Sequence, residues 1–239
     1  MRITGLFMAM PVIGTRVVPA RARIALAVMV TVVAAPMLPE FEPVPLLSLT
    51  TAVVVAKEIL IGALVGFTFQ IVFQSVVLAG QLMAMKIGLG FASMNDPANG
   101  VQTTIISQFN LMIMTLVFIA VNGHLMLIEL IIHSFETMPL GAATFSIRST
   151  MHVVELGSWL FATAVVMSLP VLTALLVINI CFGVMSRAAP QLNIFAVGFP
   201  FTLVCGLVLI WLGLSSFSPY FERVMDHGFI TVKNLLDIT

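Results

Sequence analysis

Long uncharged apolar segments dominate the chain, and short charged or proline-rich stretches separate them. The longest uncharged runs cover residues 59–85, 97–128, 156–186 and 188–221, and a shorter one covers 24–39. A helix that crosses a bilayer needs about 20 predominantly apolar residues. We therefore predict an all-α integral membrane protein with about five to six long, partly broken helices that pair as hairpins.

One stretch breaks this pattern in the middle of the chain. Residues 85–101 read MKIGLGFASMNDPANGV, and the glycines, the asparagines and the Asp96-Pro97 pair disfavour a continuous helix. In hydrocarbon, irregular backbone is tolerated only where protein buries it or where it lines a water-filled cavity. The segment is therefore our first candidate for a functional site, although an ordinary loop at the membrane surface would have the same pattern.

The composition supports membrane insertion and excludes one class of partner. The chain is 60% hydrophobic and 8% charged, with a mean hydropathy of +1.16, whereas soluble domains carry about 25% charged residues. The net charge is zero, so the electrostatic footprint of a nucleic-acid-binding protein is missing. Cys181 and Cys205 lie inside apolar segments, and we predict that they are small core residues rather than a disulfide pair.

The two ends of the chain give further expectations. Residues 3–14 are predicted to be the tail of a first membrane helix whose upstream part is missing, and Glu222–Thr239 is predicted to be an amphipathic surface helix. Lys57-Glu58 is expected at an interface, because a charge at mid-membrane costs about 2.5–3.5 kcal/mol. Pro170 is expected to kink the helix that contains it.

Polar side chains within the apolar runs have two interpretations each. Gln70 and Gln74 are four residues apart and share a helical face, so they either bond to neighbouring helices or form a wet stripe that faces a pore. Asn179 and Gly183 likewise form a small, polar contact face. Arg187 either extends to the membrane interface or pairs with an acidic group of a partner subunit.

A second stripe of titratable side chains is a candidate metal or catalytic site. Glu129, His133 and Glu136 follow at spacings of four and three, and therefore line one helical face. Neither HExxH nor a second Glu-x-x-His copy is present, so a helix end that emerges into water explains the stripe better. We expect no metal, no cofactor and no catalytic residue.

Three stretches carry a resemblance to a known family. GLGFASMNDPANG (88–100) resembles a G-L-x-F-A-x-x-x-D-P block, and FIAVNGHLMLIELIIHSFETMPLG (118–141) resembles an F-x-x-N-G-H-x-x-L-I block with a downstream P-x-G. LPVLTALLVINICFGVMSRAAPQLNIFAVGFP (169–200) resembles an L-P block followed by R-x-A-P-Q-L-x-I-F and G-F-P. Together they resemble the FliR/SctT family of type III export apparatus proteins. Family members usually carry about one more helical segment upstream, so we expect that this chain begins late.

The resemblance implies a fold context, partners and a location. Residues 1–239 would form a single export-gate domain, built with FliP-like and FliQ-like subunits into a helical hetero-oligomeric gate through which unfolded flagellar proteins pass. FliB/FlhB-like and FlhA-like export proteins are further implied partners. The implied location is the flagellar basal body in the bacterial inner membrane, with parts raised toward the periplasm.

The resemblance also implies that the central segment plugs the idle pore. Apolar side chains close a constriction by dewetting it, and Asp96 with Pro97 would cap the helix that follows, where a carboxylate suits the positive N-terminus. The implied plug residues are Gly88, Leu89, Gly90, Phe91 and Met94. Without the resemblance, Asp96 would be only a cap and Phe91 only a packing residue.

Two other functions compete with export. A small-molecule secondary transporter predicts two halves with matching broken helices, but only the 85–101 interruption is strong and no internal repeat is evident. An intramembrane enzyme needs a nucleophile with a base, or metal ligands, at helical spacing. The available residues are His124, Glu129, His133 and Glu136, and His124 lies off the stripe, so we do not expect an enzyme.

Overall fold

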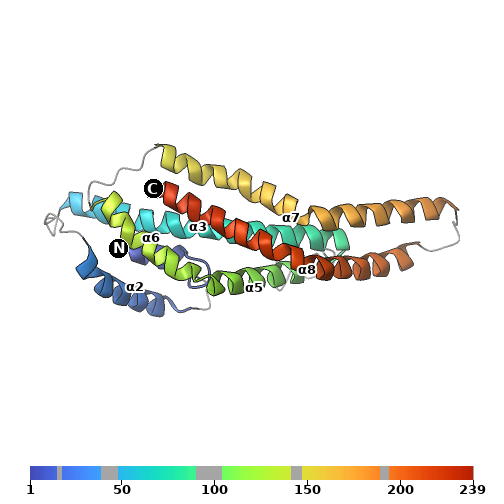
Figure 1. Cartoon of the computed structure of the whole chain (residues 1–239), viewed down its shortest axis with the longest axis horizontal. Helices are drawn as coiled ribbons and strands as arrows, with labels where there is room; N and C mark the ends of the chain where they lie inside the picture. Colours follow the sequence, from blue (N-terminus) through green and yellow to red (C-terminus); the bar gives the residue numbers. More distant parts are fainter. Residues whose placement is uncertain (15–17, 39–47, 90–103, 141–146, 189–193, 239) are drawn as a thin grey trace. The chain divides into compact units, whose positions relative to one another are not determined.

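A computed structural model describes residues 1–14, 18–38, 48–89, 104–140, 147–188 and 194–238. Every regular element in these ranges is helical, as Figure 1 shows. The elements in chain order are α1 (Arg2–Ala9), α2 (Ala20–Ala34), the short 3-10 turn η1 (Ala35–Met37), α3 (Leu49–Ile87), α5 (Ile105–Ala120), α6 (Gly123–Thr137), α7 (Ile147–Ala188) and α8 (Ile194–Leu235).

Several of these helices are long and apolar enough to cross a membrane. The segments Ala20–Met37, Leu49–Ile87 and Met151–Ala188 meet this condition singly. Two bent helix pairs, α5 with α6 and the two parts of α8, raise the number to as many as five among the described residues. The prediction of an all-α membrane protein with partly broken helices is therefore confirmed.

The helices contribute to two compact units. Unit 1 contains residues 1–73, 117–159 and 225–239, and unit 2 contains residues 74–116 and 160–224. Helices α3, α5, α7 and α8 each pass from one unit into the other.

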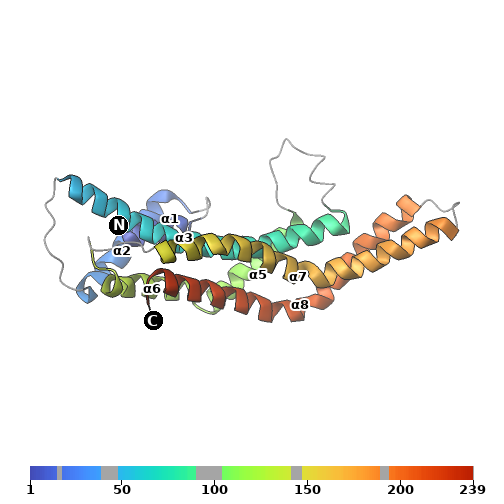
Figure 2. The same cartoon turned by 90° about the horizontal axis from the view of Figure 1, so that it is seen from above.

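In unit 1, α1 lies along α3 at backbone distance (Figure 2). A Cβ atom at Gly62 would meet the carbonyl oxygen of Arg2 and lie 2.8 Å from the backbone nitrogen of Leu6. Gly66 approaches the backbone of Ala9 and Met10 in the same way. Small residues at such crossings let two helices pack closely where the solvent is lipid. The segment predicted as the tail of a membrane helix is therefore a short helix docked on α3.

Aromatic side chains bring the C-terminal part of α8 into unit 1. The ring of Phe69 lies 4.8 Å from the ring of Phe229 and 5.8 Å from that of Phe118. Val232 and Leu235, further along α8, are also buried. The amphipathic helix predicted for Glu222–Thr239 is the C-terminal part of α8: polar residues such as Glu222, Asp226 and Lys233 are exposed, and the opposite apolar face is buried within unit 1.

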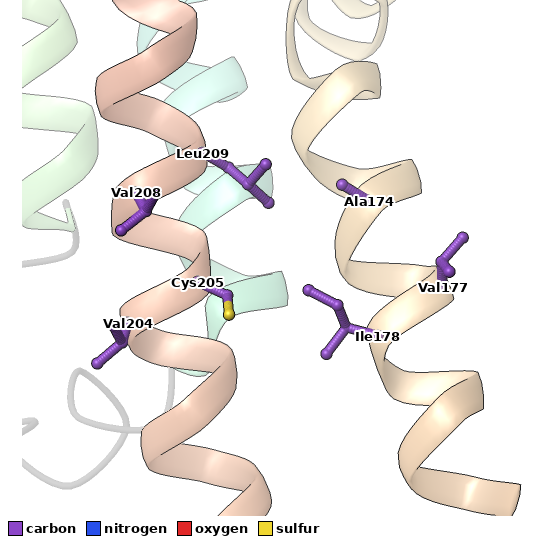
Figure 3. A pocket seen from close by; sticks show the side chains of 7 residues that line it. All are labelled: Ala174, Val177, Ile178, Val204, Cys205, Val208 and Leu209. Carbon is purple, nitrogen blue, oxygen red and sulfur yellow. The ribbon is translucent and has the colours of Figure 1, made fainter.

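In unit 2, α7 and α8 run antiparallel and touch through an edge-to-face pair, Phe182 and Phe201, whose ring centroids are 5.3 Å apart. Beside this contact lies an apolar groove of about 480 Å³. In Figure 3, Cys205 and Leu209 point from α8 toward α7, and Ile178 points from α7 toward α8. The other lining residues are Ala174, Val177, Val204 and Val208.

The two cysteines do not belong to the core of this chain. Cys181 is exposed and Cys205 is half-buried, and both are free thiols. The prediction of core positions was wrong because these helices are apolar on more than one face, so an apolar sequence context does not by itself imply burial within the chain.

Candidate functional site

The central interruption begins where α3 ends at Ile87. The backbone amide of Leu89 donates to the carbonyl of Ala84 at 3.0 Å, and the amide of Gly88 donates to the carbonyl of Met85 at 3.2 Å. These two bonds form a Schellman motif, which satisfies carbonyls that the end of a helix leaves unpaired. Gly88 has φ +99°, a conformation that glycine adopts without steric cost. The sequence therefore stops α3 at a defined residue.

The end of α3 rests against α8 within unit 2. A Cβ atom at Gly88 would lie 2.6 Å from Cε2 and 3.1 Å from Cδ2 of Phe199, so the aromatic ring covers the glycine directly. About two turns further along α8, Gly206 meets the side chain of Ile87. Ile87 is fully buried, whereas Phe199 is 49% exposed. The last residues of α3 are thus seated on two positions of α8.

The chain resumes regular structure at α5, and Thr104 caps this helix. The amide of Ser107 donates to Thr104 Oγ1 at 3.4 Å, and the amide of Gln108 donates to the Thr104 carbonyl at 3.0 Å. A threonine at the N-cap accepts from an otherwise unpaired amide of the first turn. The two hydroxyl groups of Thr104 and Ser107 also lie 2.9 Å apart. Both ends of the interruption are therefore closed by specific hydrogen bonds.

The two helices that flank the interruption, α3 and α5, also contact each other. A Cβ atom at Gly80 of α3 would lie 2.7 Å from Cα and 2.9 Å from the nitrogen of Ser107, and 3.1 Å from Nδ2 of Asn110. Asn110 is buried, and its Nδ2 has no hydrogen-bond partner among the described residues. Because α3 and α5 touch at backbone distance, the points from which the chain leaves and returns are fixed within unit 2.

The predicted plug residues divide between described and undescribed positions. Gly88 and Leu89 lie at the end of α3 and are half-buried. Gly90, Phe91, Met94, Asp96 and Pro97 lie outside the described residues. The structure thus defines both borders of the proposed plug.

The predicted contact residues are exposed on their helices. Gln70 and Gln74 on α3 are both exposed, and so is Arg187 at the end of α7. Asn179 and Gly183 are exposed, about two turns and one turn before Arg187 respectively, so the three residues share a face. A Cβ atom added at Gly183 would have no neighbour within 4 Å. Among the described residues, nothing therefore covers α7 at Gly183.

The Glu129–His133–Glu136 stripe faces outward from α6. His133 Nε2 and Glu136 Oε2 are 3.6 Å apart, and both side chains are more than half exposed. Among the described residues, no three His, Cys, Asp or Glu side chains gather closely enough to hold a metal ion. The geometry matches a solvent-facing helix surface.

Unit 1 contains a buried charge cluster that the sequence did not reveal. Arg2 is 1% exposed and Glu58 is 3% exposed; Nε of Arg2 lies 2.8 Å from Glu58 Oε2, and Nη2 lies 3.0 Å from Oε1. The guanidinium also donates to the carbonyl and the hydroxyl of Ser134, both at 2.8 Å, and to the carbonyl of Met138 at 2.9 Å. Phe135 covers it at 4.2 Å.

This cluster joins three helices through one side chain. Arg2 belongs to α1, Glu58 to α3, and Ser134 to the last turns of α6, followed by Met138. Planar two-point pairing of an arginine with a carboxylate is among the stronger polar contacts in proteins. The sequence predicted that Glu58 lies at the membrane interface, and it did not predict the contact with Arg2. The available signal was that each charged residue directly precedes an apolar run.

Comparison with known proteins identifies the family of the chain. The model of the bacterial export proteins, family 1, matches residues 1–228. This chain belongs to that family.

Individual relatives agree with this assignment. The flagellar biosynthetic protein FliR of Escherichia coli K12 is 35% identical over 236 residues, which cover 99% of this chain and 88% of the relative. FliR of Pectobacterium carotovorum is 33% identical, with 98% and 90% covered. FliR of Bacillus subtilis is 27% identical, with 98% and 92% covered.

Family membership determines the general role of the chain. This export protein is a membrane-embedded component of the flagellar export apparatus, and it works together with other components of that apparatus rather than as an enzyme. The long apolar helices agree with a position in the membrane. The assignment also favours protein export over the small-molecule transporter that the sequence left open.

Proposed function

We propose that this export protein forms, with FliP-like and FliQ-like subunits, the pore of the type III flagellar export gate. Segment 85–101 is the plug that closes this pore when no substrate passes. Unfolded flagellar proteins are the cargo, and FliB/FlhB-like and FlhA-like export proteins are further partners. The site of action is the bacterial inner membrane at the flagellar basal body, with parts of the gate raised toward the periplasm.

One observation carries the plug proposal: a 39-residue apolar helix stops at a dedicated glycine motif, and the next helix begins at a dedicated cap. Both borders are held, because α3 is seated on α8 at Gly88 and touches α5 at Gly80. Irregular backbone at membrane depth needs a protein-lined or water-filled surrounding. A conduit between subunits would provide such a protein-lined or water-filled environment. The segment would enter it from the end of α3, which α8 and α5 hold in place.

The exposed surface of the chain supports assembly with partner subunits. Within the apolar window of α7, 22% of the residues are buried inside the chain, and the exposed face of that helix carries Asn179, Gly183 and Arg187. Small and polar residues are what helices use to associate when apolar surface alone gives no preference over lipid. We propose that Arg187 pairs with an acidic partner group at this face, and that Gln70 and Gln74 bond to partner helices.

The chemistry of the plug follows from its residue types. A pore that passes unfolded chains must exclude ions between transport events, and a ring of apolar side chains does so by dewetting the constriction. Phe91 and Met94 supply those side chains, and Gly88 and Gly90 supply the backbone freedom to displace them. Asp96 and Pro97 start the return into α5.

Deletion of Gly88–Met94 tests the proposal in cells that produce the complete gate. We expect small solutes to leak across the membrane while the partner subunits still co-purify with the variant. A length-preserving variant with Phe91→Ser and Met94→Ser separates loss of the apolar seal from loss of chain length, and we expect it to leak as well. An intact permeability barrier in an assembled deletion variant would exclude the plug role.

A further inference from the structure

We propose that Phe199 is a positioning residue that latches the end of α3 to α8 and thereby determines where the chain enters segment 85–101. This inference rests on the proposed function of segment 85–101. It uses described residues alone: Phe199 and Gly206 on α8, and Ile87 and Gly88 at the end of α3. All four belong to unit 2.

The contact is specific because it requires a residue without a side chain at position 88. The Phe199 ring lies where a Cβ atom of residue 88 would be, with Cε2 only 2.6 Å from that position. Gly88 is also the residue with φ +99° that turns the chain out of α3. The ring therefore rests on the residue that determines the direction in which the chain leaves the helix.

The backbone that carries Phe199 is itself held in place. The hydroxyl of Thr202, which is 9% exposed, donates to the carbonyl of Phe199 at 3.0 Å. Pro200 follows Phe199 inside α8, and its ring restricts the backbone on both sides. Below the ring, Gly206 admits the buried side chain of Ile87. The seat is thus formed by a rigid stretch of α8.

The same contact is easy to release, which a latch requires. Phe199 is 49% exposed, so only part of its surface is withdrawn from the surroundings. A phenyl ring and a glycine backbone attract each other chiefly through dispersion, which is weak for each atom pair and falls steeply with distance. A small displacement of the end of α3 is therefore enough to break the contact.

Helix α8 provides a matched control two residues away. Phe201 is 48% exposed, which is almost the same fraction as for Phe199. Its ring packs edge-to-face on Phe182 of α7, however, with centroids 5.3 Å apart. Removal of either ring deletes the same apolar volume from the same helix, but the ring that covers Gly88 is that of Phe199.

The first measurement reports on the seat itself. Leu89→Cys is introduced into the full chain with Cys181→Ser and Cys205→Ser, and its maleimide labelling rate is measured in membranes that contain the assembled gate. We expect Phe199→Ala to raise the rate several-fold, Phe199→Leu to raise it less, and Phe201→Ala to leave it unchanged. Equal rates for Phe199→Ala and Phe201→Ala would overturn the proposal, whatever the deletion of Gly88–Met94 does.

The second measurement reports on closure. We expect Phe199→Ala to raise solute leakage several-fold above the Phe201→Ala level, and to add nothing in the chain that lacks Gly88–Met94. The Phe199→Ala variant could label faster without raising leakage, while deletion of Gly88–Met94 does cause leakage. That result would overturn the latch role of Phe199 and leave the plug role of the segment intact. If the deletion variant does not leak, the proposed function fails, and the latch role fails with it even where faster labelling shows that the seat exists.

Discussion

The seat of α1 in unit 1 and the seat of α3 in unit 2 both join helices at a glycine, but different forces hold them. In unit 1, Arg2 is buried and makes five polar contacts with Glu58, Ser134 and Met138. In unit 2, Gly88 meets the half-exposed ring of Phe199. The first seat is charged and enclosed, whereas the second is apolar and open on one side.

The difference indicates which contact resists separation more strongly. Separation of the Arg2–Glu58 pair inside the protein would leave uncompensated buried charge, which costs about 3–5 kcal/mol when one partner is removed. Separation of a ring from a glycine loses only dispersion contacts and some apolar burial. The polar contacts of unit 1 therefore resist separation of its helices, whereas the weaker contact at the end of α3 agrees with the proposal that this end can be displaced.

The largest effect is expected from a substitution that breaks the charged contact between α1 and α3. Arg2→Leu leaves Glu58 buried without its partner, and we expect a loss of about 3–5 kcal/mol in stability. The measurement is thermal unfolding of the purified gate, together with the amount of protein in membranes. The control Arg21→Leu removes an exposed arginine and should change stability by less than about 0.5 kcal/mol.

A second variant decides whether charge or packing explains that loss. Arg2→Leu combined with Glu58→Leu removes both charges, and buried pairs replaced by apolar residues are often neutral or stabilising. We expect the double variant to recover a large part of the stability. A double variant as unstable as the single one would show that the bonds to Ser134 and Met138, rather than the ion pair, hold α1.

An intermediate effect is expected from a substitution that adds a methyl group where α1 and α3 pack at backbone distance. In Gly62→Ala, the new methyl group meets the backbone of Arg2 and Leu6, and overpacking of this kind costs about 1–3 kcal/mol. The matched variant Gly183→Ala adds the same methyl group inside α7, where none of the described residues comes within 4 Å of it. Within the isolated chain it should stabilise the helix by about 0.5–1 kcal/mol. Equal unfolding temperatures for the two variants would contradict the close packing of α1 on α3.

The smallest effect is expected from the exposed stripe of α6. Alanine at Glu129, His133 and Glu136 removes solvent-facing groups, and such substitutions stay within about 0.5 kcal/mol each. Alanine at His124 in addition should still leave export active, measured as motility and as secreted flagellar protein. Complete loss of export with normal assembly would revive a catalytic or proton-relay role.

The sequence predicted the helices better than it predicted their neighbours. The apolar runs 59–85 and 156–186 fall inside α3 and α7, because a run of that length has no stable alternative to a helix in lipid. The pair of glycines at 88 and 90 marked the end of α3, since the backbone conformation at Gly88 is a local property. The cap at Thr104 was missed, because a threonine becomes a cap only once the following residues are helical.

What the sequence alone determined is the all-helical membrane class, the interruption after α3 and, through its motifs, the family. The tertiary structure decided that Arg2 meets Glu58, that the tail of α8 packs on α3, and that Phe199 covers Gly88. Helix formation depends on neighbours along the chain, and its pattern is therefore written in consecutive residues. These contacts join positions 56 to 160 residues apart. An apolar or amphipathic face shows that a helix needs a partner but does not show which partner it has.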